Sequence, residues 1–315
     1  MKAAARAAVA AGLTAYILWR SHPREVLAAL AAADWRLIAI AVVLVLADRA
    51  LMAYRWVALL CIVDPTERPR FHEIMRVFFV STFVGTFLPA SIGSDAVRAY
   101  SMAQLKVRGS DAVASVFMDR MLGVASILVM AAVGLALARD LAGNATIVLS
   151  LGVAAAACAV TLIVIFSDAA ARGLSGILAR MPAAVRHTGD RLLVSIRSYA
   201  HHHGRLAAVL GGSIAVQILR IVQAYFLGLG LAIALPLPIY FAFIPLILLV
   251  MLLPVTFNGI GTSQYAFFWF FGRAGVAAAP AFALSVLFVA LGVVGNLPGG
   301  LLYVTGASKR GRQEG

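Results

Sequence analysis

Charged residues are scarce in the 315-residue chain, and acidic residues are the scarcest. Only 13 Asp and Glu accompany 26 Lys and Arg, and charged residues make up 12% of the sequence. Hydrophobic residues make up 63%, and the mean hydropathy of +0.96 excludes an ordinary soluble domain. Several apolar runs exceed the ~18 residues that cross a bilayer as a helix. The sequence therefore predicts an all-α, polytopic integral membrane protein.

Cysteines and catalytic motifs are also few. Cys61 and Cys158 lie in separate apolar runs, which indicates neither a disulfide framework nor a metal site. The sequence has no P-loop, nucleophile elbow or HExxH motif. The run His201–His203 makes a poor tetrahedral metal site, because adjacent side chains on a helix point in different directions. We therefore expect no cofactor, no metal and no enzymatic activity.

The formal net charge of +13 is spread over the loops between apolar runs. This distribution is typical of the positive-inside bias and of attraction to anionic lipid, so we expect no nucleic-acid partner. The longest polar connection, residues 167–205, combines many Arg residues with apolar residues at helical spacing. We expect this connection to lie along the cytoplasmic surface of the membrane.

Six full spans are expected, and two shorter apolar runs end in breaks. The first break, Pro89 to Gly93, follows the run 74–88, and the second, Pro254 to Gly261, follows the run 239–253. Proline removes a backbone donor and glycine permits a sharp reversal, so each break ends one helix before another begins. The expected spans are residues 3–19, 37–63, 112–138, 144–166, 206–235 and 277–304.

The two breaks resemble each other, because each has Leu-Pro followed by Ile-Gly, then a short amphipathic arm and a full span. This pattern predicts an internal repeat with paired discontinuous helices, which line the substrate site in transporters. If each break forms a re-entrant hairpin, most Lys and Arg residues share one face with both termini, and that face is cytoplasmic. A single membrane domain, 1–315, then contains inverted halves 1–138 and 144–306.

Charged residues inside the expected spans point to the substrate. Each costs at least ~2.5 kcal/mol on insertion scales, so it normally faces a partner or a wet cavity. One-to-one pairing of the Asp and Arg residues leaves two cations over, which an anionic ligand can neutralise. Arg donates two parallel hydrogen bonds to phosphate, and a helix beginning near Ala96 adds backbone donors. These residues are Asp48, Arg49, Arg55, Asp119, Arg120 and Arg220 in spans, and Asp95 and Arg98 in the first hairpin.

The candidate substrate-binding residues combine these charges with residues of both hairpins. The alternative for Asp48 and Asp119 is ion pairing that only locks helices together. For the neutral residues of the second hairpin, the alternative is to satisfy backbone groups freed by the break. The candidates are Arg49, Arg55, Pro89, Ser91, Gly93, Asp95, Arg98, Arg120, Arg220, Asn258, Gly261 and Gln264, with Asp48 and Asp119 as supporting ion-pair partners.

Two further patterns favour structural roles. The aromatic arm, residues 265–271, is expected to form an interfacial belt or a lipid-facing surface. The glycines within residues 292–300 are expected to allow close packing of helices.

The sequence resembles the flippase-like membrane domain of lysylphosphatidylglycerol synthases in four motifs that occur in the same order. These motifs are residues 88–100, 119–123, 254–261 and 297–300. The resemblance covers nearly the whole chain and implies lipid handling. In the synthases this domain moves an aminoacylated phospholipid across the membrane, and stand-alone relatives are linked to hopanoids and polyprenyl-linked glycans. The chain ends at Gly315 without room for the aminoacyl-transferase domain, so lipid aminoacylation is not expected. Gln264 replaces an acid of the family, which weakens the case for a cationic headgroup.

We therefore expect a flippase of the bacterial inner membrane. It would bind an anionic phospholipid, or a polyprenyl or hopanoid lipid, between its hairpins and move it between leaflets, with both termini in the cytoplasm. Two alternatives stay open: an integral-membrane lipid-phosphate transferase, and a non-transporting scaffold for lipid synthesis. A homo-oligomer or a lipid-synthesis enzyme is also left open as a partner.

Overall fold

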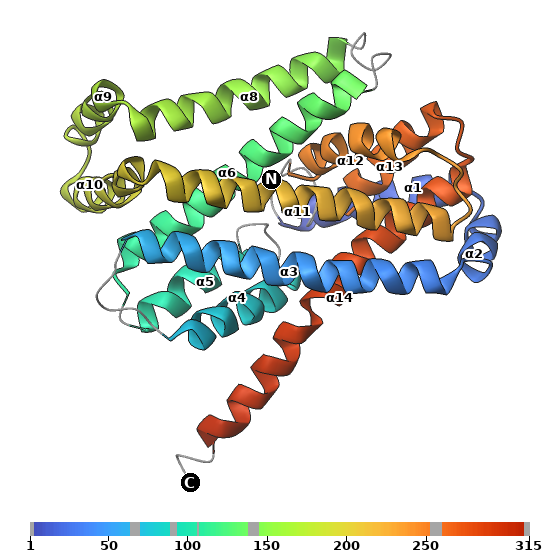
Figure 1. The fold of residues 1–315 in the computed structure, drawn as a ribbon, viewed down its shortest axis with the longest axis horizontal. Coiled ribbons are helices and arrows are strands. Elements are labelled where there is room, and N and C mark those ends of the chain that lie inside the picture. Colours follow the sequence, from blue (N-terminus) through green and yellow to red (C-terminus); the bar gives the residue numbers. More distant parts are fainter. Residues whose placement is uncertain are drawn as a thin grey trace.

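The structure, a computed structural model, describes residues 3–63, 70–88, 93–105, 107–137, 145–252 and 260–311. Within these ranges every regular element is a helix and there is no strand, so the predicted all-α fold is confirmed (Figure 1). The helices are α1 (Ala3–Arg20), α2 (Pro23–Ala31), α3 (Trp35–Val63), α4 (Phe71–Thr86), α5 (Gly93–Gln104), α6 (Gly109–Leu137), α8 (Ala145–Phe166), α9 (Asp168–Leu178), α10 (Ala183–Ser198), a 3-10 turn (Tyr199–His201), α11 (His203–Gly230), α12 (Leu237–Leu252), α13 (Thr262–Arg273) and α14 (Ala278–Gly311).

Four helices, α3, α6, α11 and α14, are long and apolar enough to cross a bilayer. Helices α8 and α9, bent by 83° at a short break, pass the same test together, so the described residues hold four or five candidate spans. α1 was predicted to span but is not among them. Its alanine-rich sequence carries Arg6 and Arg20 within 18 residues, which lowers its mean hydropathy.

Helices α3 and α11 form an antiparallel pair at the centre of the molecule (Figure 1). At one end of the pair, the Asp34 backbone N–H donates to the Gly230 carbonyl at 2.8 Å. At the other end, the Tyr199 hydroxyl donates to the Leu59 carbonyl at 3.3 Å. Burial raises the pKa of Tyr199 above its usual value, so the phenol stays protonated and keeps this hydrogen bond. The ends of the two long helices are therefore fixed against each other.

Two short helical hairpins flank this pair. α4 and α5 pack together, and the Arg98 guanidinium on α5 lies over the Phe78 ring on α4 at 4.5 Å. α12 and α13 pack together through Tyr240 and Phe271, whose ring centroids are 5.3 Å apart. Both breaks, residues 89–92 and 253–259, lie outside the described residues, as do the candidates Pro89, Ser91 and Asn258.

The packing of the two halves is reciprocal. α3 pairs with α11, α4 packs on α14, and α12 packs on α6. Corresponding elements also match in length: α3 has 29 residues and α11 has 28, α4 and α12 have 16 each, and α5 and α13 have 12 each. The order long helix, hairpin, long helix therefore occurs twice, and each hairpin rests on the long helix that follows the other.

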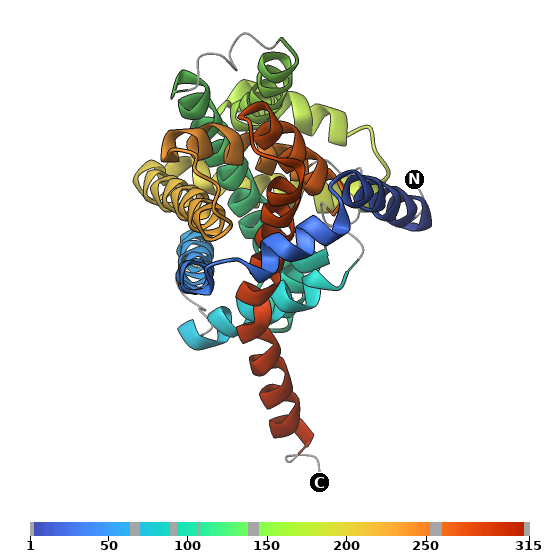
Figure 2. The ribbon, with the colours of Figure 1, turned by 90° about the vertical axis from the view of Figure 1, so that its right-hand side faces the viewer.

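Glycines make these crossings close. A Cβ at Gly299 on α14 would lie 2.0 Å from the Phe79 carbonyl oxygen on α4, and one at Gly134 on α6 would lie 2.4 Å from the Phe241 carbonyl oxygen on α12. The predicted packing role of the glycines in 292–300 is confirmed by such contacts. Beyond this crossing α14 projects past the other helices, where Leu301 is exposed (Figure 2).

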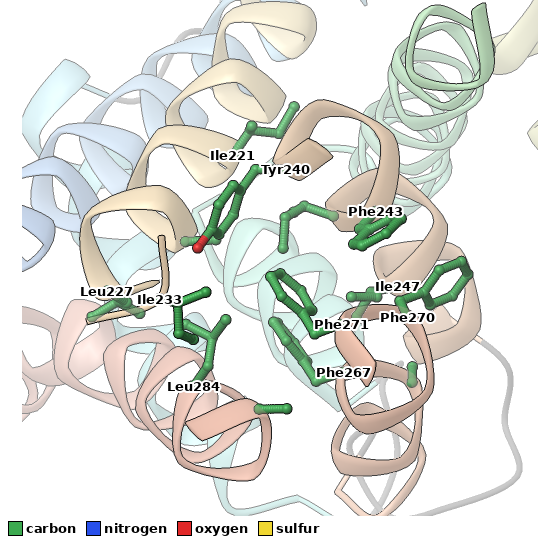
Figure 3. Packing of buried hydrophobic residues seen from close by; sticks show 14 of the residues in the cluster. Ile221, Leu227, Ile233, Tyr240, Phe243, Ile247, Phe267, Phe270, Phe271 and Leu284 are labelled. Carbon is green, nitrogen blue, oxygen red and sulfur yellow. The ribbon is translucent and has the colours of Figure 1, made fainter. Parts of the chain in front are cut away.

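The prediction for the aromatic arm was wrong in part. Phe267, Phe270 and Phe271 of α13 are buried against α12 and α14, where they form the largest hydrophobic cluster with Tyr240 and Phe243 (Figure 3). The three side chains occupy positions i, i+3 and i+4, which lie on one face of a helix, and this face packs inward. Tyr265 of the arm is exposed, and Phe268 and Trp269 are half-buried.

The connection after α8 is helical and attached to the body at one end. The Ser195 hydroxyl of α10 donates to the buried Asp111 carboxylate at the start of α6, at 2.7 Å. Arg197 of α10 forms an ion pair with Asp168 at the start of α9. These contacts orient α9 and α10, while their position on a lipid surface stays a prediction.

Candidate functional site: a buried cationic centre

A polar stripe on α3 faces α11. Asp48, Met52 and Arg55 follow each other at i, i+4 and i+7, which places them on one side of the helix. α11 presents Ser213 and Arg220 at the same seven-residue spacing. Because the helices are antiparallel, Asp48 meets Arg220 at 3.5 Å and Arg55 donates to the Ser213 hydroxyl at 2.8 Å. These two contacts join the middle parts of α3 and α11.

The Asp119 cluster consists of Asp119, Arg55, Arg98 and the neighbouring pair Asp95–Arg120. Arg55 lies with Nη2 2.7 Å and Nε 2.9 Å from Asp119 Oδ1, while Arg98 Nη1 lies 3.4 Å from Oδ2. The side chains of Arg55, Arg98 and Asp119 are only 5, 6 and 8% exposed. Both carboxylate oxygens of Asp119 are therefore engaged by a guanidinium from another helix.

Aromatic rings enclose Arg98. Its guanidinium carbon lies 4.9 Å from the Trp56 ring centroid and 4.5 Å from that of Phe78. A guanidinium over aromatic faces is attracted by their quadrupoles, and the attraction strengthens when water is excluded. The Trp56 indole is itself fixed by donating to the Ser115 hydroxyl at 3.3 Å. Arg98 is thus held in one place by α3, α4 and α6.

Asp95 and Arg120 add a second link between α5 and α6. Arg120 Nε lies 2.5 Å from Asp95 Oδ2, and the Arg120 side chain is 38% exposed. Each helix contributes one acidic and one basic residue to the two ion pairs: α5 supplies Asp95 and Arg98, and α6 supplies Arg120 and Asp119. This reciprocal arrangement holds the second arm of the first hairpin against α6.

The Asp48 cluster consists of Asp48, Arg49, Arg220 and Met52. The Asp48 side chain is 1% exposed and faces Arg49 Nη1 at 3.3 Å and Arg220 Nε at 3.5 Å. Arg49 also donates from Nη2 to the Gly292 carbonyl on α14 at 3.4 Å. Two positive charges share one carboxylate in this cluster, so it carries a net positive charge.

The two clusters together hold five Arg and three Asp, so two positive charges exceed the acids within the centre. In the described part of the chain, no group of three or more His, Cys, Asp or Glu residues is placed to hold a metal ion. The arrangement suits an anion rather than a cation, because Arg offers donors and no acceptor.

Three predicted residues lie on the hairpins instead. Gln264 is buried at the start of α13, where its Oε1 accepts from the Gly261 backbone N–H at 2.5 Å and from the Ser263 hydroxyl at 2.9 Å. Gly261 has a φ of 90° and approaches the backbone of Ala10, so it needs to be glycine. Gly93 begins α5 close against Leu88. The described contacts of Gln264 and Gly261 are with each other and with α1, not with the clusters.

Sequence reasoning missed several partners of the charges. Ser213, Met52 and the rings of Trp56 and Phe78 contact the arginines, yet none is charged. The signal for Met52 was present, since it lies one turn from both Asp48 and Arg55 on the same face. Ser213 had the equivalent signal, because it lies seven residues before Arg220.

The long apolar helices and the charges buried among them define a multi-pass integral membrane protein with a cationic centre at the crossing of its helices. The family described as the lysylphosphatidylglycerol synthase TM region matches residues 3–299, so the chain belongs to this family, which indicates a membrane protein with a lipid-related function. No curated protein shows a match to the chain.

Proposed function

We propose that the protein is a lipid flippase, which binds a lipid with an anionic, phosphate-bearing headgroup and moves it between leaflets of the bacterial inner membrane. The observation that carries the proposal is the surplus of two positive charges among the buried and half-buried Arg and Asp residues of α3, α5, α6 and α11. Uncompensated buried charge is costly, and a phosphate that enters the centre relieves that cost. Membership of a lipid-related family supports the same class of substrate.

The reciprocal packing supports two inverted halves as the moving parts. α3, α4, α5 and α6 correspond to α11, α12, α13 and α14, and α3 runs antiparallel to α11. Such a relation places a pseudo-two-fold axis within the membrane plane, the arrangement of many secondary transporters. In this proposal the two hairpins are re-entrant, and one half rocks against the other.

Orientation follows from the basic loops. Both termini, residues 64–76 and 98–108 and the connection 167–205 carry 17 of the 26 Lys and Arg residues of the chain. The positive-inside rule places this face, and both termini, in the cytoplasm. We propose transport rather than catalysis, because the acids of the centre are each engaged by an Arg and are not free to act as a base.

The test is leaflet exchange in proteoliposomes. Vesicles would contain fluorescent phosphatidylglycerol or fluorescent phosphatidylcholine, and dithionite would report the lipid left in the inner leaflet. We expect wild type to accelerate exchange of the anionic lipid over empty vesicles, Arg220→Ala to lose this activity while still eluting as a folded protein, and the exposed Arg186→Ala to keep it. If folded wild type does not accelerate the exchange of any lipid, downhill transport is wrong and a scaffold role is favoured.

A further inference from the structure

The two clusters of the centre differ in how completely their arginines are satisfied. Arg55 reaches Asp119 at 2.7 Å and also has the Ser213 hydroxyl at 2.8 Å, both normal distances for charge-assisted bonds. The contacts of Asp48 with Arg49 and Arg220, at 3.3 and 3.5 Å, are long for such bonds. The ion pairs of the Asp48 cluster are therefore looser, and Asp48 Oδ1 itself is buried without a hydrogen-bond partner.

Both guanidinium groups also approach a sulfur atom. Arg220 Nη2 lies 3.2 Å and Arg49 Nη1 lies 3.4 Å from the Met52 thioether. A thioether is a weak acceptor, whereas a phosphate oxygen accepts a guanidinium N–H strongly. Arg49 Nε is buried without a hydrogen-bond partner. Two guanidinium groups thus meet at a point where an oxyanion would bind better than the sulfur does.

The same two arginines are the more reachable ones of the α3–α11 interface. Their side chains are 14 and 21% exposed, against 5% for Arg55. α14 leaves room for Arg49 by having glycine at two successive turns, since a Cβ at Gly295 would lie 3.2 Å from Arg49 Nε. The pair lies in the middle part of both long helices, the depth at which transporter sites occur.

We propose that Arg49 and Arg220 form the docking site for a phosphate mono- or diester, while Arg55 and Arg98 hold Asp119 in place and do not contact the ligand. This assignment rests on the proposed transport function and names the phosphate site within it. Asp48 sets the strength of the site, because its carboxylate competes with the ligand for the two guanidinium groups. The ligand chemistry is shared by lipid headgroups and soluble phosphates, and we assign the lipid as its source.

Binding to the full-length purified protein in a neutral detergent tests the assignment. Native mass spectrometry would measure the affinity for dioctanoyl phosphatidylglycerol, with dioctanoylglycerol and glycerol 1-phosphate as comparisons that lack the phosphate or the acyl chains. We expect Arg49→Gln and Arg220→Gln each to weaken phosphatidylglycerol binding by about tenfold or more, the loss of one charged hydrogen-bonding partner. Arg36→Gln, an exposed change on the same helix, should leave the affinity unchanged.

Asp48→Asn gives the sharper result. It keeps the side-chain volume, removes the competing charge and should tighten phosphatidylglycerol binding by about tenfold. A misfolded variant does not gain affinity, so this outcome distinguishes ligand binding from a structural role. Unchanged or weaker binding by Asp48→Asn, or binding of glycerol 1-phosphate as tight as that of the lipid, would overturn the assignment.

The same samples separate this site from the transport proposal. If Arg49→Gln and Arg220→Gln bind like wild type while wild type still exchanges lipid between leaflets, the docking site is wrong and transport stands. If binding follows the predicted charges but wild type exchanges no lipid, the site stands and transport fails.

Discussion

Arg55 and Asp119 lie 64 positions apart in the sequence, yet two guanidinium nitrogens of Arg55 contact one oxygen of the Asp119 carboxylate, at 2.7 and 2.9 Å. The other oxygen accepts from Arg98. One buried carboxylate on α6 therefore joins the first hairpin to α3, and through α3 to the central pair. Removing this carboxylate would leave two buried guanidinium groups without their anion.

We expect Asp119→Asn to destabilise the protein strongly. Breaking a buried ion pair by neutralising one partner costs about 3–5 kcal/mol, because the remaining charge is left uncompensated. Thermal unfolding in detergent, followed by size-exclusion chromatography, would show a lower apparent melting temperature. Asp190→Asn is the matched control. Asp190 faces Arg186 at 3.8 Å in a largely exposed pair, and such pairs contribute little, so its melting temperature should stay close to wild type.

Reversal of the Asp95–Arg120 pair tests whether this link is structural. Asp95→Arg or Arg120→Asp alone places like charges together beside Arg98 and Asp119, and each should lower the melting temperature. The double variant restores opposite charges and should recover most of the loss. A double variant no better than the worse single change would show that the native order of charge matters in its own right.

Helix positions could be predicted from the sequence, because run lengths and breaks carry that information. The expected arm after the second break became α13, and the span 37–63 became α3. The span 206–235 ended early, at Gly230, where the Ile233 N–H returns to the Gly228 carbonyl and Ala232 has a φ of 56°. A left-handed alanine gives no sequence signal, since glycine is the residue that favours that conformation.

The ion-pair partners of the charged residues could not be predicted from the sequence. Asp119 contacts arginines of α3 and α5 and not its neighbour Arg120, whereas Asp48 does pair with its neighbour Arg49. Which helices meet depends on packing of distant segments, and one sequence does not contain that information. The burial of Phe267, Phe270 and Phe271 was readable from their i, i+3, i+4 spacing, although aromatic composition alone suggested a membrane interface.

Two helix crossings should be sensitive to added side-chain volume, because a glycine at each brings the helices into close contact. Gly299→Ala and Gly134→Ala would each force apart a long helix and a hairpin, at a cost of about 1–3 kcal/mol for overpacking. Gly211→Ala on α11 meets no atom within 4 Å and should be neutral or stabilising, since alanine favours helix. Melting temperatures of the three variants check the difference. Equal effects at all three positions would rule out close packing as the role of these glycines.

The basic helices α9 and α10 should contact an anionic membrane surface. Arg180, Arg186 and Arg191 are exposed, and each basic residue near such a surface contributes about 1 kcal/mol. Hydrogen exchange of residues 172–194 should be slower in nanodiscs with phosphatidylglycerol than in phosphatidylcholine alone.

Replacing these three arginines by Gln should abolish the difference between the two nanodisc compositions. Identical exchange of wild type in both lipids would contradict surface contact.

The seven-residue spacing of the α3–α11 contacts also limits how the molecule can move. A heptad slip of α11 in one direction would set Arg220 against Arg55, two like charges at close range, and a slip in the other direction would leave Asp48 facing Ser213 in place of Arg220. The contacts thus encode a single register. Because the pair is also joined at both of its ends, α3 and α11 move together as one rigid unit, and the other helices must move around them.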